Sequence, residues 1–283
     1  MKNKNNLVDF IGIGVQKSAT TWMYSMLTSH PEIKGAKGGL KNKEVNFFNR
    51  SYFLGFDWYN NKFEFGDHIV GEFSTLYFPE CSVPERVYKY NPDIKLILIV
   101  RNPIDRAFSQ HKFQFMKNRL SEKSKDFDCA LEINPSYIDQ GLYAKHLANW
   151  LNFFTLKQIL IITFDDIKDN CGNELKKAYK FLGVDENYVP DAIQSKVNAS
   201  YHVKSRLLNR AYSGIARRLP DVVVKIFKKT GLTSIVRRAN RKKISDEVIK
   251  PMTTETRHNL NTIFKDDIVD FESMISRDLS QLK

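Results

Sequence analysis

The chain has 283 residues, 42% of them hydrophobic, which is enough to bury the core of one large α/β domain. No apolar run approaches the roughly 18 residues of a membrane span, residues 1–6 are charged and Asn-rich and do not resemble a signal peptide, and three widely spaced cysteines form neither a disulfide framework nor a metal knuckle. We therefore expect a cytoplasmic protein whose single domain spans residues 1–283, with an anionic partner to match the net charge of +12.

The first predicted element is an apolar strand at residues 8–14, followed by a tight loop at 15–19 and a helix that begins at Thr20. We expect Gly12 and Gly14 to let the backbone approach a ligand closely, and the free N–H groups of the helix to point back at the loop that carries Lys17. This is the pattern of an anion cradle. Its spacing differs from the G-x-x-x-x-G-K-[ST] loop of nucleoside triphosphatases, so the sequence predicts a phosphate-like ligand held by a related geometry.

Strand and helix patterns alternate along residues 8–182. The predicted strands are 8–14, 68–73, 94–100 and 158–164, and the predicted helices are 82–90, 103–117, 140–154 and 174–182. Ser82 and Glu85 are three residues apart, which is typical of a capping box at a helix start. The alternation predicts the α/β class, with a mostly parallel sheet covered on both faces. Ligands bind at the carboxyl ends of such strands, from which the Lys17 loop, residues 72–75 and residues 101–103 emerge.

Arg101 follows one of these buried strands, and Ser109 lies two helical turns further on. A guanidinium fork and a hydroxyl are suited to a phosphate, so the pair predicts a second phosphate site beside the first loop. The alternative is that Arg101 forms an ion pair at the sheet edge and that Ser109 is an ordinary helix residue.

The positive charge is concentrated at residues 201–243, which hold 13 Lys or Arg residues and one acidic residue, while the rest of the chain has no net charge. Apolar residues are interleaved with these cations, which predicts a partly amphipathic helical segment that contacts an anionic membrane or a polyanionic acceptor. The alternative is a solvated helical face packed on the domain. Residues 253–283 are expected to form a closing amphipathic helix with the apolar stripe Leu260, Ile263, Phe264, Ile268, Phe271 and Met274.

Several blocks of the chain resemble one enzyme family. They are GVQKSATTW (14–22), KEVNFF (43–48), GEFSTLYF (71–78), VPERVYKYNPDIKLILIVRNP (83–103, which runs into RNPIDRAFS at 101–109) and NWLNFFTLKQILI (149–161). Together they resemble, in order, the sulfotransferases that use 3′-phosphoadenosine-5′-phosphosulfate (PAPS), in particular a bacterial-type member of the heparan-sulfate or glycan-type carbohydrate branch. The resemblance implies a three-layer α/β/α P-loop-like fold with a central parallel sheet.

The resemblance also implies a nucleotide site and a reaction that leaves adenosine 3′,5′-bisphosphate. No group of Cys, His, Asp or Glu residues has the spacing of metal ligands, so we expect the reaction to be metal-free. Lys17 would contact the leaving phosphate oxygen, and Arg101 and Ser109 would bind the 3′-phosphate. The residues that would surround the 5′-phosphate are Ser18, Ala19, Thr20, Thr21 and Trp22. The residues that would form a basic lid over the nucleotide are Lys204, Ser205 and Arg206.

Glu44 is the predicted general base. It lies between Lys43 and the aromatic pair Phe47 and Phe48, whose burial is expected to keep the carboxylate partly dry. The alternative is a surface Lys–Glu pair. Many relatives have His where this chain has Asn46, so an accessory role of that His does not transfer.

The predicted acceptor is a hydroxyl of a carbohydrate or glycolipid, with an amine as the second choice. Residues expected to contact it are Lys43, Phe47, Glu72, Ser74, Tyr143, Asn149 and Trp150. Phe73 replaces the Lys of the branch's Glu-Lys-Thr-Pro stretch, which puts a second catalytic lysine in doubt. A helix that packs Trp150 in the core is the alternative to a sugar-binding one.

Two other functions stay open. A P-loop kinase would need the Walker spacing and a Mg²⁺ carboxylate, which we do not find. A non-catalytic polyanion or membrane-binding module would use the basic segment, but it leaves Lys17, Glu44 and Arg101 unexplained. For the sulfotransferase itself, contact of the basic segment with an anionic membrane would place the cytoplasmic protein at the inner face of that membrane. We expect no specific nucleic acid partner.

Overall fold

A computed structural model of the chain describes residues 6–191, 193, 201–203, 241–243 and 249–282. The chain groups into two compact units, the first made of residues 1–107, 135–197 and 254–283 and the second of residues 108–134 and 198–253. The single domain expected over residues 1–283 stays a prediction.

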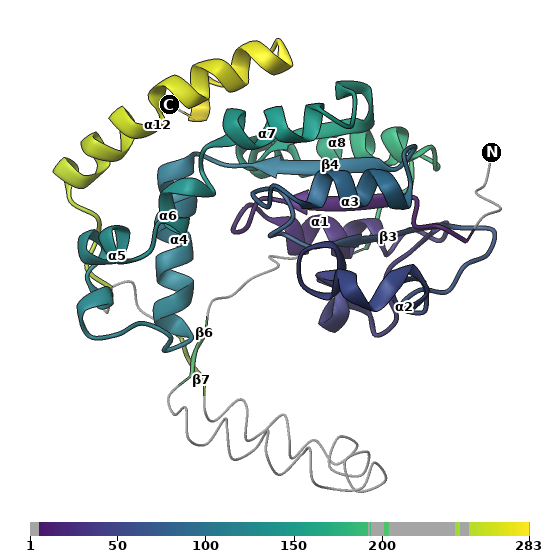
Figure 1. Ribbon diagram of the computed structural model, residues 1–283, viewed down its shortest axis with the longest axis horizontal. Helices are drawn as coiled ribbons and strands as arrows, with labels where there is room; N and C mark the ends of the chain where they lie inside the picture. Colours follow the sequence, from purple (N-terminus) through teal and green to yellow (C-terminus); the bar gives the residue numbers. More distant parts are fainter. Residues whose placement is uncertain (1–5, 192, 194–200, 204–240, 244–248, 283) are drawn as a thin grey trace, which may run out of the picture. The chain divides into compact units, whose positions relative to one another are not determined.

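The first unit is built on a five-stranded parallel sheet with the strand order β2-β3-β1-β4-β5 (Figure 1). Its strands are β1 (Phe10–Gly14), β2 (Ile33–Lys34), β3 (Ile69–Phe73), β4 (Lys95–Val100) and β5 (Ile159–Thr163). Four of them confirm the predicted strands to within two residues. The sequence did not predict β2, which is two residues long and so shows no periodicity.

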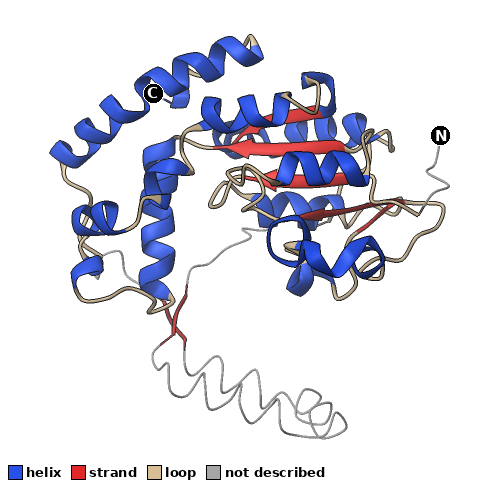
Figure 2. Ribbon diagram, in the orientation of Figure 1, coloured by secondary structure: helices blue, strands red, loops and turns tan. Residues whose placement is uncertain are grey.

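Helices cover both faces of the sheet, which confirms the three-layer α/β/α fold (Figure 2). Helices α1 (Thr20–Leu27) and α8 (Phe164–Leu182) bury one face in a core that includes Phe10, Phe73 and Ile97. Helices α3 (Val83–Tyr90) and α7 (Tyr143–Leu151) lie over the other face, and α12 (Thr254–Ile275) packs on α7.

The strand order reverses its direction between β1 and β4, which makes this the switch point of the sheet. The chain leaves β1 toward β2 and β3, whereas it leaves β4 toward β5 on the opposite side. Ligands of open parallel sheets bind at such a switch point, at the carboxyl ends of the strands. A ligand site is therefore expected at the loops that follow Gly14 and Val100.

Gly12 is required by a neighbouring side chain. A Cβ atom at Gly12 would lie 2.0 Å from the ring of Phe73, which is fully buried on the adjacent strand. A Cβ at Gly14 would lie 3.0 Å from the Cβ of Phe78. The expected approach of a ligand is thus not what demands glycine at position 12, since an aromatic ring of the protein fills that space.

The predicted starts of α3 and α8 differ from the structure. Ser82 precedes α3 but makes no side-chain capping bond, so the predicted capping box is wrong. A capping box forms instead at Thr163 and Asp166, and α8 begins there, ten residues before the predicted helix. Asn170 has non-helical angles within α8 (φ −148°, ψ 78°), which breaks the periodicity along its first half.

Shorter elements connect the strands of the first unit. Between β2 and β3 these are η1 (Gly39–Asn42), η2 (Phe47–Ser51), η3 (Tyr52–Leu54) and α2 (Gly55–Asn60). Further along the chain they are α6 (Ser136–Asp139), η5 (Leu156–Gln158) and η7 (Ser280–Leu282). The helix predicted at 140–154 is thus the shorter α7, preceded by α6.

The second unit contains the later part of α4 (Pro103–Met116), together with η4 (Lys123–Lys125) and α5 (Phe127–Ile133). Asp126 caps α5 by accepting hydrogen bonds from the N–H groups of Asp128 and Cys129, and it pairs with Lys250 at 3.2 Å. The ring of Phe127 contacts that of Phe108 with centroids 5.1 Å apart.

The ends of the basic segment are strands. β6 (Tyr201–Val203) and β7 (Arg241–Lys243) pair in antiparallel fashion, so the helical prediction is wrong for these six residues. Residues 204–240, which include Lys204, Ser205 and Arg206, lie outside the described residues.

Along the C-terminal helix α12, Leu260, Phe264, Ile268 and Phe271 are buried as predicted, whereas Ile263 is exposed. Among the helices that the structure describes, none combines the length and the apolar character needed to cross a membrane.

Candidate active site

The loop after β1 is shaped for an anion. Lys17 and Ala19 both have left-handed backbone angles (φ 75° and 58°), which turn the chain sharply into α1. Met23 donates its N–H to the carbonyl of Ala19, so the N–H groups before it have no partner within the helix. The Ser18 hydroxyl is fully buried, and no hydrogen-bond partner for it exists among the described residues. Donors without partners at a helix N-terminus suit a phosphate oxygen.

Arg101 lies against this loop. Its Nη1 donates to the carbonyl oxygen of Lys17 at 3.3 Å, and its guanidinium carbon lies 4.5 Å from the ring centroid of Phe164. Tyr143 donates its hydroxyl to the Arg101 carbonyl at 2.7 Å. The loops after β1, β4 and β5 thus meet at the switch point. Ser109 is half-buried on α4 and belongs to the second unit, so its place in the phosphate site stays a prediction.

Glu44 lies at the same edge of the sheet, in a stretch that we call the base segment (residues 43–48). Its Oε1 accepts a hydrogen bond from Thr75 Oγ1 at 3.0 Å and pairs with Lys43 Nζ at 3.2 Å. The Glu44 side chain is 39% exposed and that of Lys43 is 7% exposed. The aromatic pair does not enclose Glu44, because both rings are buried in the core, so the carboxylate faces solvent.

Lys43 is a buried cation beside the candidate base. Burial lowers the pKa of Lys43, and the charges of Glu44 and Glu72 oppose that shift. Its Nζ also lies 6.0 Å from the centroid of the Phe73 ring. The ion pair with Glu44 therefore extends from the protein interior to the surface, unlike the surface Lys–Glu pair considered above.

Glu72 and Ser74 lie at the end of β3, next to the base segment, and both are 0% exposed. The Glu72 carboxylate accepts four hydrogen bonds from the protein, and burial raises its pKa to about 6. Both side chains bind the protein's own groups next to the base segment, and their contact with an acceptor stays a prediction.

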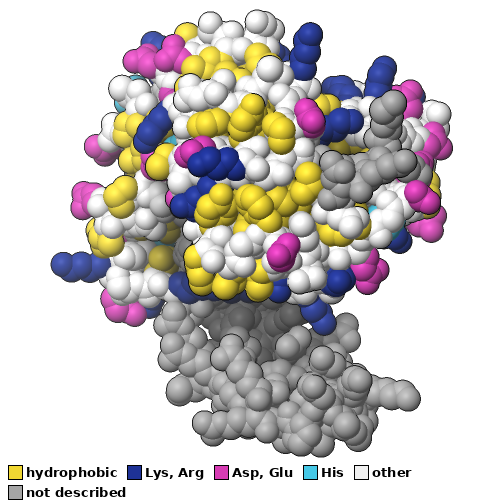
Figure 3. Space-filling model, turned by 45° about the vertical axis from the view of Figure 1, so that its right-hand side comes forward, with side chains coloured by type: hydrophobic (Ala, Val, Ile, Leu, Met, Phe, Trp, Pro, Cys, Tyr) yellow, Lys and Arg dark blue, Asp and Glu magenta, His cyan; other side chains and the backbone are white. Residues whose placement is uncertain are grey.

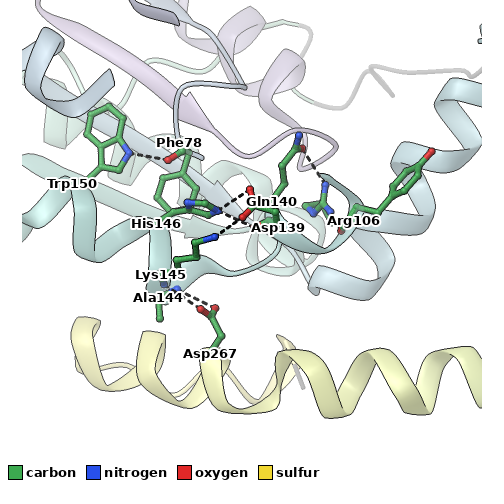
Figure 4. Close-up of polar contacts among 10 residues, drawn as sticks. Phe78, Arg106, Asp139, Gln140, Ala144, Lys145, His146, Trp150 and Asp267 are labelled. Carbon is green, nitrogen blue, oxygen red and sulfur yellow. Dashed lines mark hydrogen bonds and ion pairs between the residues drawn. The ribbon is translucent and has the colours of Figure 1, made fainter. Parts of the chain in front are cut away.

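Three further residues predicted to contact the acceptor also point inward. The Phe47 ring is fully buried and stacks on Tyr59 with centroids 4.7 Å apart. Trp150 donates its indole N–H to the carbonyl of Phe78 at 3.1 Å (Figure 4). Trp150 and Tyr143 are both fully buried. Asn149 is half-buried and donates to the Cys81 carbonyl at 3.0 Å. Substrate contact by these residues stays a prediction.

Asp267 of α12 fixes the start of α7. Its carboxylate accepts hydrogen bonds from the N–H groups of Ala144 and Lys145 at 3.0 and 3.1 Å, as Figure 4 shows. Burial raises the pKa of Asp267. On the same helix, His146 Nε2 lies 2.8 Å from the Asp139 carbonyl, and burial lowers the pKa of His146. Helix α7, whose Tyr143 binds the Arg101 carbonyl, is thus anchored at its first turn.

Basic and acidic side chains are interspersed over the described part of the face in Figure 3, in line with the balanced charge outside residues 201–243. Within the part of the chain that the structure describes, no group of three or more His, Cys, Asp or Glu residues is arranged to hold a metal ion.

Thr75, Tyr59, Tyr77 and Phe164 take part in the site and were not among the predicted site residues. Phe164 directly follows β5 and Thr75 is the second residue after β3, so the rule that ligands bind at strand ends gave a signal for both. Tyr59 and Tyr77 carry no such signal, because only the folded chain brings their hydroxyls to Glu72.

A family model described as Sulfotransferase domain matches residues 7–218. Among curated proteins, the chain is 34% identical over 185 residues to mouse heparan sulfate glucosamine 3-O-sulfotransferase 5, which covers 61% of this chain and 52% of that protein. The chain thus spans about half the length of that relative.

Two solved structures share the fold. A sulfotransferase from Alicyclobacillus acidocaldarius matches with a TM-score of 0.68 at 22% identity, covering 97% of this chain and 98% of its own. The mouse sulfotransferase SULT7A1 complexed with PAP matches with a TM-score of 0.55 at 17% identity, covering 96% and 87%. At these identities the likeness bears on the fold alone.

Proposed function

The chain belongs to the sulfotransferase domain family, and we propose that it transfers a sulfuryl group from PAPS to a hydroxyl of a carbohydrate acceptor. The observation that carries this proposal is the meeting of the Lys17 loop with Arg101 at the switch point, with Glu44 at the same sheet edge.

We propose that the Lys17 loop (residues 15–19), the start of α1 and Arg101 bind the nucleotide. The free N–H groups at the start of α1 and the unpartnered Ser18 hydroxyl fit a 5′-phosphate. Lys17 is placed in that loop to meet the negative charge that develops on the leaving phosphate oxygen. Arg101, held by the Lys17 carbonyl and the Phe164 ring, presents its remaining donors to a 3′-phosphate.

Glu44 is the residue that we propose acts on the acceptor. In the transfer, the bond between sulfur and the bridging oxygen of the donor breaks, and the acceptor oxygen forms the new bond to sulfur. Glu44 takes the acceptor proton as general base, and Thr75 and Lys43 hold its carboxylate in place. When bound, the donor supplies an activated phosphosulfate, so the protein orients the reactants, stabilises charge and removes the acceptor proton.

A heparan-type glycan is the proposed acceptor class, by extension from the curated relative. Between β2 and the base segment, Lys34 at the end of β2, Lys37 in the loop and Lys41 in η1 are exposed, which suits an anionic polysaccharide. A glycolipid and an amine acceptor are the other outcomes that the assay below distinguishes.

The proposal is tested in two steps. Adenosine 3′,5′-bisphosphate should raise the melting temperature of the full chain, and ATP with Mg²⁺ should raise it much less, whereas the reverse order would favour a kinase. Labelled PAPS is then offered with desulfated N-acetylated heparan, with its N-deacetylated form and with a neutral glycolipid. Label in the first gives O-sulfation of a glycan, label only in the second gives N-sulfation, label only in the third gives a glycolipid acceptor, and label in none contradicts the carbohydrate proposal.

A further inference from the structure

Glu72 is the most heavily bonded carboxylate of the described site. Its Oε1 accepts hydrogen bonds from the hydroxyls of Tyr59 and Tyr77 at 3.0 and 2.9 Å, and its Oε2 accepts from the hydroxyl of Ser74 at 2.6 Å. The fourth donor is the backbone N–H of Val45 at 3.1 Å. A fully buried charge with four donors is costly to assemble, so its position calls for an explanation.

These bonds lead to the base segment. Besides the direct bond to Val45, Ser74 Oγ accepts the N–H of Asn46 at 2.9 Å, and Tyr77 Oη accepts the N–H of Phe48 at 3.3 Å. The N–H of Phe73 reaches the carbonyl of Lys43 at 3.2 Å. We call residues 72–77 the support segment, because these residues bind the backbone on both sides of Glu44.

The base segment needs such support, because it belongs to no strand of the sheet. Asn46 has a left-handed backbone (φ 53°), and the helical turn η2 begins only after it. Buried backbone N–H groups require acceptors. A carboxylate supplies acceptors on both oxygens, and the charge of Glu72 also favours the protonated form of the neighbouring Lys43.

We propose that Glu72 is a positioning residue for the candidate base: it holds the backbone of residues 45 and 46, directly and through Ser74, and thereby fixes Glu44 at the edge of the sheet. The part of this inference that concerns catalysis rests on the proposed function. The part that concerns the backbone stands without it.

Hydrogen–deuterium exchange of the full chain tests the backbone part, with no substrate present. In Glu72→Gln, the amide NH₂ replaces an acceptor with a donor, so the N–H groups of Val45 and Asn46 should exchange about tenfold faster or more. Tyr179→Phe is the matched control, because it removes one buried hydroxyl bond, to the Met26 carbonyl, on the far side of the sheet. Unchanged exchange in residues 43–48 of Glu72→Gln would overturn the proposal.

Activity tests the catalytic part. We expect Glu72→Gln and Ser74→Ala to lower kcat about tenfold to a hundredfold, since a small misplacement of a catalytic group has effects of this size. The affinity for adenosine 3′,5′-bisphosphate should stay within twofold, and Glu72→Asp should recover part of kcat. A general loss of folding would lower nucleotide binding as well, and that result would contradict a positioning role.

These experiments distinguish a failure of the proposed function from a failure of the positioning role. If the wild-type chain sulfates none of the acceptors but Glu72→Gln frees the amides of the base segment, the proposed function fails and the backbone role holds. If the wild type is active and both variants retain its kcat, the positioning role fails and the proposed function holds.

Discussion

The Lys17 loop (residues 15–19), which we call the phosphate loop, and the base segment (residues 43–48) lie at the same edge of the sheet. The two segments are held in shape in different ways. Residues 15–19 take their shape from the strand before them, the helix after them and two left-handed residues. Residues 43–48 take theirs from side chains of the support segment that bind their backbone. The proposed nucleotide site and the proposed base therefore depend on separate parts of the fold, so substitutions should affect them separately.

Among the substitutions that test whether the two segments act separately, Glu44→Gln is expected to lower kcat most. It removes the proton acceptor and keeps the size of the side chain, so kcat should fall by about 10²–10⁴. Calorimetric titration with adenosine 3′,5′-bisphosphate should give the wild-type affinity. Wild-type turnover in this variant would reject Glu44 as the base.

Lys17→Ala is the counterpart in the phosphate loop. Loss of one preorganised charge contact at the leaving oxygen should lower kcat by about 10²–10³. Unlike the substitution at Glu44, it should also weaken nucleotide binding in the same titration. If Lys17→Ala leaves the nucleotide affinity unchanged while Glu44→Gln reduces it, the phosphate loop and the base segment do not have the separate roles proposed for them.

A smaller effect concerns pH and Glu72. The folded pKa of about 6 exceeds the ordinary value of 4.5, so the folded state binds this proton more tightly than the unfolded state. The contribution of Glu72 to the free energy of unfolding is therefore fully present below about pH 4 and falls by about 2 kcal/mol as the pH rises to 7.

Urea unfolding of the wild type and of Glu72→Gln at pH 4 and pH 7 measures this difference. The titratable groups that interact with Glu72 are Lys43, Tyr24, Tyr59, Tyr77 and Tyr90, with Glu44 beyond Lys43, and all six are present in both proteins. The destabilisation caused by the substitution should be about 2 kcal/mol smaller at pH 7. An equal destabilisation at both pH values would argue against a raised pKa.

The smallest effect is expected from Phe164→Leu. It removes the aromatic face under the Arg101 guanidinium, a contact of about 1 kcal/mol. Adenosine 3′,5′-bisphosphate should bind about fivefold more weakly, with kcat at saturating PAPS nearly unchanged. A fall in kcat without any change in affinity would show that Phe164 acts elsewhere.

The phosphate loop could be predicted from the sequence because it depends on local pattern. An apolar run, glycines and a helix start indicate a strand, a loop and a helix, and the rule that ligands bind at strand ends brings Arg101 to Lys17. The four longer strands were predictable for the same reason. Helix α8 was predicted only from residue 174 because Asn170 interrupts its first half.

The base segment could be predicted only in part. Its motif indicated Glu44, but Glu72 and Ser74 were assigned to the acceptor, and the structure buries both. Their roles depend on hydrogen bonds between residues about 30 positions apart, which leave no periodic signal. The exposure of Glu44 was missed for a related reason, because Phe47 and Phe48 pack inward against Tyr59.

The contact between Gly12 and Phe73 limits how this site can change. Phe73 stands where the glycan branch has a lysine, and its ring fills the space that any larger residue at position 12 would need. A lysine introduced at position 73 alone would leave a cavity over Gly12 and place its stem in the core. Restoring that cation by engineering therefore requires positions 12 and 73 to be redesigned together, as one linked pair.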